Sequence, residues 1–251
     1  MVYEYPIQFA RFYDLIYHQV RDSVDLEFFQ NEIRQTKGKI LEIGVGTGRS
    51  FIQALKEGAD IFGLDISPAM INILLKKLEK DQHWRISLQN IVDFAIDFRF
   101  DLIIAPFRVM MHVLDKEEQI RALNNVYDHL NENGRFIFDA FIPDLSRLIH
   151  GFNNETDFEG EYEPGKKMRR IVSTQPDLVN QIINVHFLIE WEEENVLKRD
   201  EWNVPMRFFF RYEMEHLVER SKFTTYKILG DYQGTELNKD SKEFVVICQK
   251  Q

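Results

Sequence analysis

The sequence of 251 residues is poor in cysteine and has no long apolar run. Its single cysteine, Cys248, excludes an intrachain disulfide and fits a reducing compartment. No apolar stretch approaches the ~20 residues that a helix needs to span a bilayer. Residues 1–6 lack the basic region and apolar run of a secretory signal. We therefore expect a cytoplasmic protein that does not insert into a membrane.

Basic residues are also scarce, with 31 Lys and Arg against 41 Asp and Glu and a formal net charge of −10. Nucleic-acid-binding proteins usually place a basic face against the phosphates, so this balance argues against nucleic acid as a partner. A short basic strip at 166–170 is the local exception. With 44% hydrophobic and 29% charged residues, the chain can bury one sizeable core under a well-solvated surface.

Hydrophobic periodicity in the first 150 residues predicts strands that alternate with helices. Ser67 and Pro68 predict a helix start, because a capping hydroxyl precedes a proline in the first turn. This alternation indicates βαβ units and a mostly parallel sheet with helices on both faces. The predicted strands are 39–43, 60–65, 84–88, 100–105 and 135–138. Helical spacing covers 7–36, 48–57, 67–80 and 116–130.

The pattern changes after about residue 150. Three segments rich in Ile, Val, Phe and Trp (168–174, 180–191 and 195–211), with turn signals at 175–177 and 193–195, predict an antiparallel sheet. The α/β pattern then returns with a helix at 212–221 and strands at 224–230 and 243–249. We therefore assign 1–150 and 212–251 to an α/β domain and 151–211 to an insertion. The insertion could cover a substrate or join a second copy of the chain as a homodimer.

A glycine-rich turn between a predicted strand and helix is the sharpest motif, with Gly44, Gly46 and Gly48 at alternate positions. Dinucleotide-binding domains use the longer spacing Gly-x-Gly-x-x-Gly, in which a pyrophosphate rests on the helix N-terminus. Glu42 would be a poor neighbour for a pyrophosphate, but it can meet the amino group of a methionyl tail. Asp65 ends the next strand, where a carboxylate can accept hydrogen bonds from both ribose hydroxyls. The set predicts S-adenosylmethionine (SAM), which carries no phosphate.

These motifs resemble those of the class I SAM-dependent methyltransferases over roughly residues 10–145 and the last two strands. The resemblance implies a Rossmann-like α/β fold with a seven-stranded, mostly parallel sheet and a small antiparallel β insertion after the fifth strand. It implies SAM as the cofactor and S-adenosylhomocysteine (SAH) as its product. It assigns the following residues to SAM: Tyr13, Tyr17, Glu42, Gly44, Gly46, Gly48, Asp65, Ile66, Met70, Asn90, Ile91 and Phe107.

One SAM residue departs from the family pattern. The loop after the third strand usually carries an aspartate that meets the adenine amino group, and Asn90 stands in that place. An amide oxygen can still accept this hydrogen bond. The segment around Tyr13 and Tyr17 resembles the helix that caps the SAM pocket in members acting on small molecules. The inserted strands are typical of members that methylate amines, including amino sugars, so we expect a small-molecule acceptor.

The segment 106–112 follows the fourth strand, at the sheet edge where open α/β sheets bind ligands. His112 is the candidate general base, since its unperturbed pKa lies near neutrality. Tyr13 is a second catalytic candidate, and Arg108 with His112 could hold the substrate. Simple packing or surface roles stay open for each of these side chains. We predict in-line methyl transfer to an N or O atom, with no metal site.

Four other functions compete with this one. An NAD-dependent oxidoreductase predicts the longer glycine spacing and a catalytic Tyr–Lys or His arrangement, neither of which is found. DNA amino-methyltransferases carry Asn/Asp-Pro-Pro-aromatic after the fourth strand, where this chain has Ala-Pro-Phe-Arg at 105–108, and the acidic charge argues against nucleic acid. A protein methyltransferase and a non-catalytic SAM-binding protein are left open by the sequence.

Overall fold

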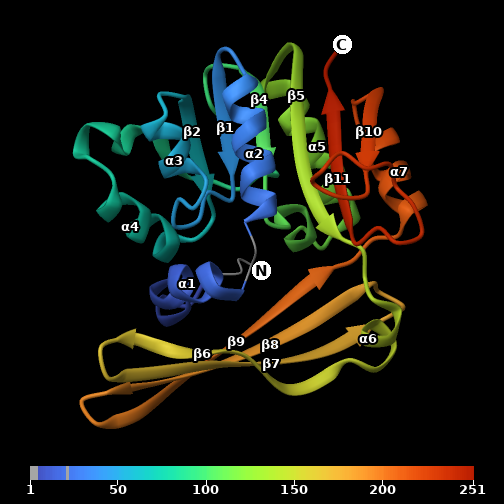
Figure 1. The fold of residues 1–251 in the computed structure, drawn as a ribbon. Helices are drawn as coiled ribbons and strands as arrows, with labels where there is room; N and C mark the ends of the chain where they lie inside the picture. Colours follow the sequence, from blue (N-terminus) through green and yellow to red (C-terminus); the bar gives the residue numbers. More distant parts are fainter. Residues whose placement is uncertain (1–4, 21–22) are drawn as a thin grey trace.

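The computed structural model describes residues 5–20 and 23–251, which form a seven-stranded sheet and a four-stranded sheet (Figure 1). The sequence interpretations for residues 1–4 and for 21–22 lie outside the described residues. The large sheet contains β1 (Lys39–Ile43), β2 (Asp60–Asp65), β3 (Ile86–Leu88), β4 (Phe100–Ala105), β5 (Leu130–Phe141), β10 (Thr225–Leu229) and β11 (Glu243–Gln249). The helices around it are α2 (Val24–Gln35), α3 (Phe51–Lys56), α4 (Pro68–Lys77), α5 (Lys116–His129) and α7 (Arg211–Glu219), with short 3₁₀ helices η1 (Lys80–Arg85) and η2 (Val109–His112).

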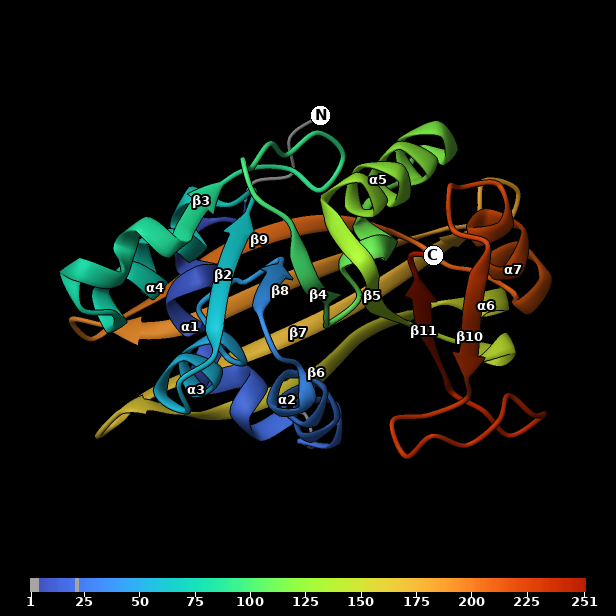
Figure 2. The ribbon, with the colours of Figure 1, turned by 90° about the horizontal axis from the view of Figure 1, so that it is seen from above.

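The strands of the large sheet follow the order β10-β11-β5-β4-β1-β2-β3 (Figure 2). The first five strands in the chain pair in parallel, and β11 is antiparallel to both β5 and β10. The chain leaves β1 toward β2 on one side and returns to β4 on the other. The carboxyl ends of β1 and β4 therefore flank a topological switch point, where sheets of this kind bind ligands. The predicted Rossmann-like fold is confirmed.

Apolar side chains cover both faces of this sheet. On one face Phe29 of α2, Phe51 of α3 and Leu74 of α4 are fully buried against the strands. On the other face Leu123 of α5 and Met214 of α7 are fully buried in a second cluster. Because the central strands are buried on both sides, they are almost continuously apolar in sequence, which is why they were predictable. Among the described residues, no helix has both the length and the apolar character of a membrane span.

The inserted sheet consists of four long antiparallel strands in the order β6-β7-β8-β9. They are β6 (Phe152–Glu163), β7 (Lys166–Asp177), β8 (Ile182–Glu193) and β9 (Val196–Arg207), and α6 (Leu145–His150) precedes them. Helix α1 (Ile7–Val20) lies between the two sheets (Figure 1). Its Phe9, Phe12 and Ile16 pack against Phe158 and Trp191 of the inserted sheet. The helix therefore stands where it can close a site at the switch point.

The structure corrects several element boundaries. Strand β6 was not predicted, because most of its side chains are polar and exposed at the edge of the sheet. The predicted turn at 175–177 is wrong: these residues belong to β7, and the connection to β8 follows them. Pro176 lies opposite Ile183 of β8, and on its other side the pairing with β6 ends at Thr174, so Pro176 has a partner strand on one side only. The other predicted turn is confirmed, since Asn195 lies in the hairpin between β8 and β9.

Smaller differences concern helix ends. The helical spacing over 7–36 belongs to two helices, α1 and α2, and the helix that starts at Pro68 ends at Lys77, not near residue 80. Trp84, predicted to begin a strand, lies in η1. The predicted helix start is confirmed, because Oγ of Ser67 accepts a hydrogen bond from the backbone N–H of Met70.

Candidate active site

The glycine turn leaves β1 at the switch point, and its three glycines adopt left-handed backbone angles, with φ of +71° at Gly44, +55° at Gly46 and +89° at Gly48. A Cβ atom on Gly44 would stand 2.4 Å from a methyl group of Val109, so close packing requires glycine there. A Cβ on Gly46 would meet nothing nearer than the Gly44 carbonyl oxygen at 3.9 Å. The backbone at Gly46 therefore faces open space, as a loop that cradles a ligand must.

Asp65 at the end of β2 is joined to this turn. Its Oδ2 accepts a hydrogen bond of 2.8 Å from the backbone N–H of Gly46, and its Oδ1 accepts one of 2.8 Å from that of Ser67. Burial raises the pKa of Asp65, while these backbone donors lower it. Each carboxylate oxygen has a second lone pair, which a ribose hydroxyl can use. Asp65 can therefore brace the turn and receive a sugar at once.

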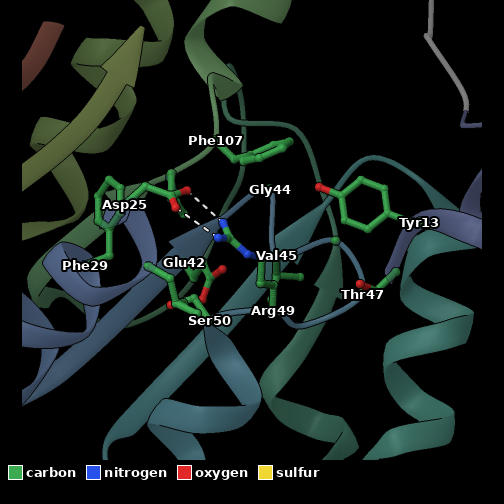
Figure 3. A pocket seen from close by; sticks show the side chains of 13 residues that line it. Tyr13, Asp25, Phe29, Glu42, Gly44, Val45, Thr47, Arg49, Ser50 and Phe107 are labelled. Atoms are coloured by element: carbon green, nitrogen blue, oxygen red, sulfur yellow. Dashed lines mark hydrogen bonds and ion pairs between the residues drawn. The ribbon is translucent and has the colours of Figure 1, made fainter. Parts of the chain in front are cut away.

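Glu42, the last but one residue of β1, is 3% exposed, and its Oε2 has no hydrogen-bond partner within the described part of the chain. Burial raises its pKa to about 8, against opposing effects of Ser50 and Arg49. Beside it, the Arg49 guanidinium donates to both carboxylate oxygens of Asp25 at 2.7 and 2.9 Å (Figure 3). A buried carboxyl group with this oxygen unpartnered, next to a guanidinium, fits the ammonium and carboxylate ends of an amino-acid tail.

Aromatic side chains of α1 and of the loop after β4 lie across this pocket. The rings of Tyr13 and Tyr17 are 4.5 Å apart, and the ring of Phe107 is 5.1 Å from that of Tyr17. Helix α1 is tied to the turn by Asp14, which accepts hydrogen bonds from the Thr47 hydroxyl at 2.6 Å and the Lys77 ammonium at 2.5 Å. Tyr13 and Phe107 line the pocket and Tyr17 packs against both, and electron-rich rings of this kind suit a cationic sulfonium.

These features together fit SAM. Glu42, Gly46 and Arg49 line one pocket, where the amino-acid tail of SAM is expected, and the contact of Asp65 with this turn keeps its predicted role toward the sugar a prediction. When bound, SAM supplies a methyl group that its sulfonium has already made electrophilic.

Comparisons with known proteins agree with this site. Residues 40–134 match the family model described as a methyltransferase domain. These residues form a methyltransferase domain, and the chain is a SAM-dependent methyltransferase. It is similar to a glycine/sarcosine N-methyltransferase of Aphanothece halophytica, with 26% identity over 94% of this chain and 86% of that protein. Two solved structures share its fold. One is a SAM-dependent methyltransferase from Clostridium acetobutylicum (TM-score 0.75, 19% identity, 97% and 98% of the two chains). The other is SAM-bound CalS10, an amino pentose methyltransferase from Micromonospora echinaspora (TM-score 0.71, 16% identity, 95% and 96%).

The structure shows Arg108 of the methyltransferase in contacts within the chain, and its role in holding the substrate stays a prediction. Its guanidinium donates two hydrogen bonds of 2.7 Å to Glu243 on β11, and its backbone N–H donates to Oδ1 of the fully buried Asp139 at 2.8 Å. Phe107 and Arg108 both have left-handed φ values, 63° and 69°. Phe107 and Arg108 therefore form a strained turn, and the contacts of Arg108 with Asp139 and Glu243 hold this turn in place. In this sense Arg108 anchors the turn.

His112 ends η2 next to the fully buried Met110 and Met111, but its own ring is exposed. Its deep placement nevertheless lowers its pKa to about 4. This direction of the pKa change means that the imidazole of His112 is neutral at pH 7.

The residues assigned to the adenine lie along the edge formed by β2 and β3. Met70 is a buried residue of the first turn of α4, and Ile66 is half-buried beside Asp65. Ile91 is 4% exposed and belongs to the main core, while Asn90 next to it is exposed. The Oδ1 of Asn90 accepts from the backbone N–H of Val92 at 3.1 Å. The adenine roles of these four residues stay predictions.

Sequence reasoning missed several residues that line the pocket of the methyltransferase. They come from α2, from the glycine turn and the residues just before α3, and from the loop after β4. Arg49 could have been found, because it directly follows Gly48. No sequence signal pointed to α2, whose position under the turn is a tertiary feature. The missed residues are Asp25, Leu26, Phe29, Val45, Thr47, Arg49, Ser50 and Pro106.

Proposed function

We propose that this methyltransferase transfers the methyl group of SAM to a nitrogen atom of a small molecule. The observation that carries the proposal is one pocket lined by the buried Glu42, whose Oε2 has no partner in the described part of the chain, and by the open backbone at Gly46. Relatives that act on glycine or sarcosine and on amino pentoses support nitrogen as the acceptor atom. Positioning an acceptor in line with the methyl group and excluding water can supply roughly 7–11 kcal/mol of the barrier.

In this proposal His112 acts on the acceptor as a neutral hydrogen-bond acceptor. A neutral imidazole can accept an N–H of the amine and so direct the nitrogen lone pair toward the methyl group. An imidazolium there would repel the sulfonium, so the lowered pKa of His112 suits this task. Tyr13 and Tyr17 close the other side of the site from α1. Tyr13 remains the second catalytic candidate.

The insertion at 151–211 is proposed to wall the acceptor site. Its inner face presents Val172 of β7, Val185 of β8 and Val204 of β9 in one apolar cluster. Contacts between β9 and η2 bring this face beside the segment that carries His112. A homodimer through the outer face of the insertion stays a prediction from the sequence.

The test is calorimetric titration of SAM and of NAD, followed by a screen of small primary and secondary amines that measures SAH release. We expect SAM to bind and NAD not to bind, and at least one amine to raise SAH release well above the rate without acceptor. NAD binding without SAM binding would refute the proposal. SAH release with hydroxyl compounds but with no amine would move the acceptor from nitrogen to oxygen.

A further inference from the structure

A buried serine and a buried glutamine lie behind Glu42 in the wall of the SAM pocket. Ser50 directly precedes α3 and is 5% exposed, and Gln30 of α2 is 1% exposed. Ser50 lines the pocket next to Glu42 (Figure 3). Gln30 stands behind Ser50, because its side-chain amide donates to the Ser50 carbonyl oxygen at 2.8 Å and to the Ser50 hydroxyl at 3.1 Å. Burying polar side chains costs free energy unless hydrogen bonds replace their water, so the bonds of this row decide its properties.

The carbonyl oxygen of Ser50 fixes the direction of each hydrogen bond in the row. A carbonyl oxygen only accepts, so the Gln30 atom that faces it is Nε2, and the same Nε2 also donates to Oγ of Ser50. Because Oγ of Ser50 accepts from Gln30, the hydroxyl hydrogen of Ser50 points away from Gln30, and Glu42 receives it. Oε2 of Glu42 has no hydrogen-bond partner among the described residues, so this bond goes to Oε1.

The same row decides which oxygen of Glu42 carries a proton when the carboxyl group is neutral. Since Oε1 accepts from Ser50, the proton belongs on Oε2. Burial raises the pKa of Glu42 to about 8, so this proton is present at pH 7 in the ligand-free protein. A protonated Oε2 is a donor, whereas an ammonium needs an acceptor. The ammonium of an amino-acid tail can therefore bind to Oε2 only when the proton leaves.

The charged groups around Glu42 do not supply the positive charge that would keep it ionised. Arg49 lowers the pKa of Glu42, but Asp65 raises it. The Arg49 guanidinium is already bound to both carboxylate oxygens of Asp25, at 2.7 and 2.9 Å. Tyr13 of α1 lines the same pocket and brings no positive charge. A cationic ligand group beside Oε2 would supply what the described residues do not.

We propose that Gln30 and Ser50 are positioning residues that direct Oε2 of Glu42 to the ammonium of SAM, and that binding of SAM or SAH expels one proton from Glu42. The inference rests on the proposed function, because it takes the amino-acid tail of SAM to lie in this pocket. The hydrogen on Oε2 leaves to water as a proton. The lone pair left on Oε2 then accepts an N–H of the ammonium, which keeps its charge.

This coupling has a defined pH dependence. Where Glu42 is protonated before binding and ionised after it, affinity for SAH rises about tenfold for each pH unit. Near pH 8 the amino group of the free ligand also begins to lose its proton, so the gain in affinity stops there. A ligand without the amino-acid tail has no ammonium to place and should bind equally well from pH 6 to 8.

A purely structural role is the competing explanation, in which Gln30 and Ser50 only join α2 to the start of α3. Substitutions would then lower stability and leave the pH dependence of binding unchanged. If the row positions Glu42, Ser50→Ala removes a donor to Glu42, which keeps its proton to a higher pH. The rise in SAH affinity then moves to higher pH. Gln30→Met should move it in the same direction by less, and Ser50→Thr, which keeps the hydroxyl, should restore the wild-type curve.

The experiment titrates SAH and methylthioadenosine, which lacks the amino-acid tail, into the full chain between pH 6 and 8. Calorimetry in phosphate and in Tris, which differ in ionisation enthalpy, counts the protons released. We expect SAH to release about one proton at pH 6.5 and methylthioadenosine to release none. SAH should release no proton from Glu42→Gln. Gln53→Met is the matched control for Gln30→Met, because Gln53 bonds to the exposed Glu57 and should leave the pH dependence unchanged.

Release of no proton with SAH would overturn the inference, as would equal release with methylthioadenosine or from Glu42→Gln. Folded Ser50→Ala and Gln30→Met variants with the wild-type pH dependence would overturn the positioning role. If these two variants do not fold, the proton counts for the wild-type chain and Glu42→Gln decide. SAH binding without proton release leaves the proposed function standing, whereas absence of both SAM and SAH binding refutes both.

Discussion

The backbone N–H of Gly46 donates a hydrogen bond of 2.8 Å to Oδ2 of Asp65. This contact joins the turn after β1 to the end of β2, two neighbouring strands of the sheet. The carboxylate that is expected to hold the ribose therefore also fixes the turn that is expected to hold the rest of SAM. Binding and local order at this site depend on the same side chain.

We predict that Asp65→Ala weakens SAM binding by more than tenfold, about 1.4 kcal/mol or more, because it removes sugar contacts and loosens the turn. The fold should persist, since the core clusters do not include Asp65. Calorimetry measures the affinity and circular dichroism the fold. Asp65→Asn, which keeps one acceptor oxygen, should lose less. Unchanged SAM affinity in Asp65→Ala would mean that the sugar lies elsewhere.

Glu42→Gln should make the ligand-free protein more stable at pH 8 while weakening its hold on SAM. The pKa of Glu42 is raised from 4.5 to about 8 by burial. Between these two pH values the folded state keeps a proton that the unfolded state has released, so stability falls as pH rises. Glutamine does not titrate, so the variant lacks this loss. The difference at pH 8 should be on the order of 4 kcal/mol.

Urea unfolding of wild type and Glu42→Gln at pH 5, 6, 7 and 8 measures this effect. The two free energies of unfolding should converge at pH 5 and separate as pH rises. Glu57→Gln is the control, because Glu57 is exposed and paired with Arg34. Parallel pH dependences for wild type and Glu42→Gln would show that the buried carboxyl group keeps an ordinary pKa.

His112→Ala should lower kcat by about 10²–10⁴ while SAM affinity stays within a factor of two or so, because the side chain is proposed to act on the acceptor. Since the pKa of His112 is lowered to about 4, the imidazole should cause no change in rate between pH 6 and 8. Steady-state assays of SAH release give kcat, and calorimetry gives SAM affinity. His216→Ala, on the exposed surface of α7, is the control. Full activity in His112→Ala would reduce His112 to a packing role.

Arg108→Gly should be more stable than Arg108→Ala by about 1 kcal/mol, because an L-residue in the left-handed region pays a penalty that glycine avoids. Both variants lose the ion pair with Glu243, so their difference isolates the backbone strain. Urea unfolding measures it. A more stable alanine variant would show that the turn relaxes once the side chain is removed.

The α/β part of the fold was open to prediction from the sequence because its strands are buried on both faces and are therefore apolar throughout. Strand β6 was not, since an edge strand with mostly exposed polar residues resembles a loop in sequence. Pro176 predicts a turn from the sequence, although it lies within β7. The sequence does not show that the pairing with β6 ends at Thr174, before the proline.

The sequence by itself determined the glycine turn, the acidic residues Glu42 and Asp65, and hence the class of ligand. These groups lie at the carboxyl ends of two strands that are consecutive in the chain, and such ends meet at one edge of a parallel sheet. Only the tertiary structure decided that Arg108 is an anchor, that Arg49 pairs with Asp25 of α2, and that Arg170 is buried beside Tyr17 of α1. Each of these contacts joins segments far apart in the chain. Local periodicity carries no record of such partners, since it reports how a side chain faces the core and not which distant element covers it.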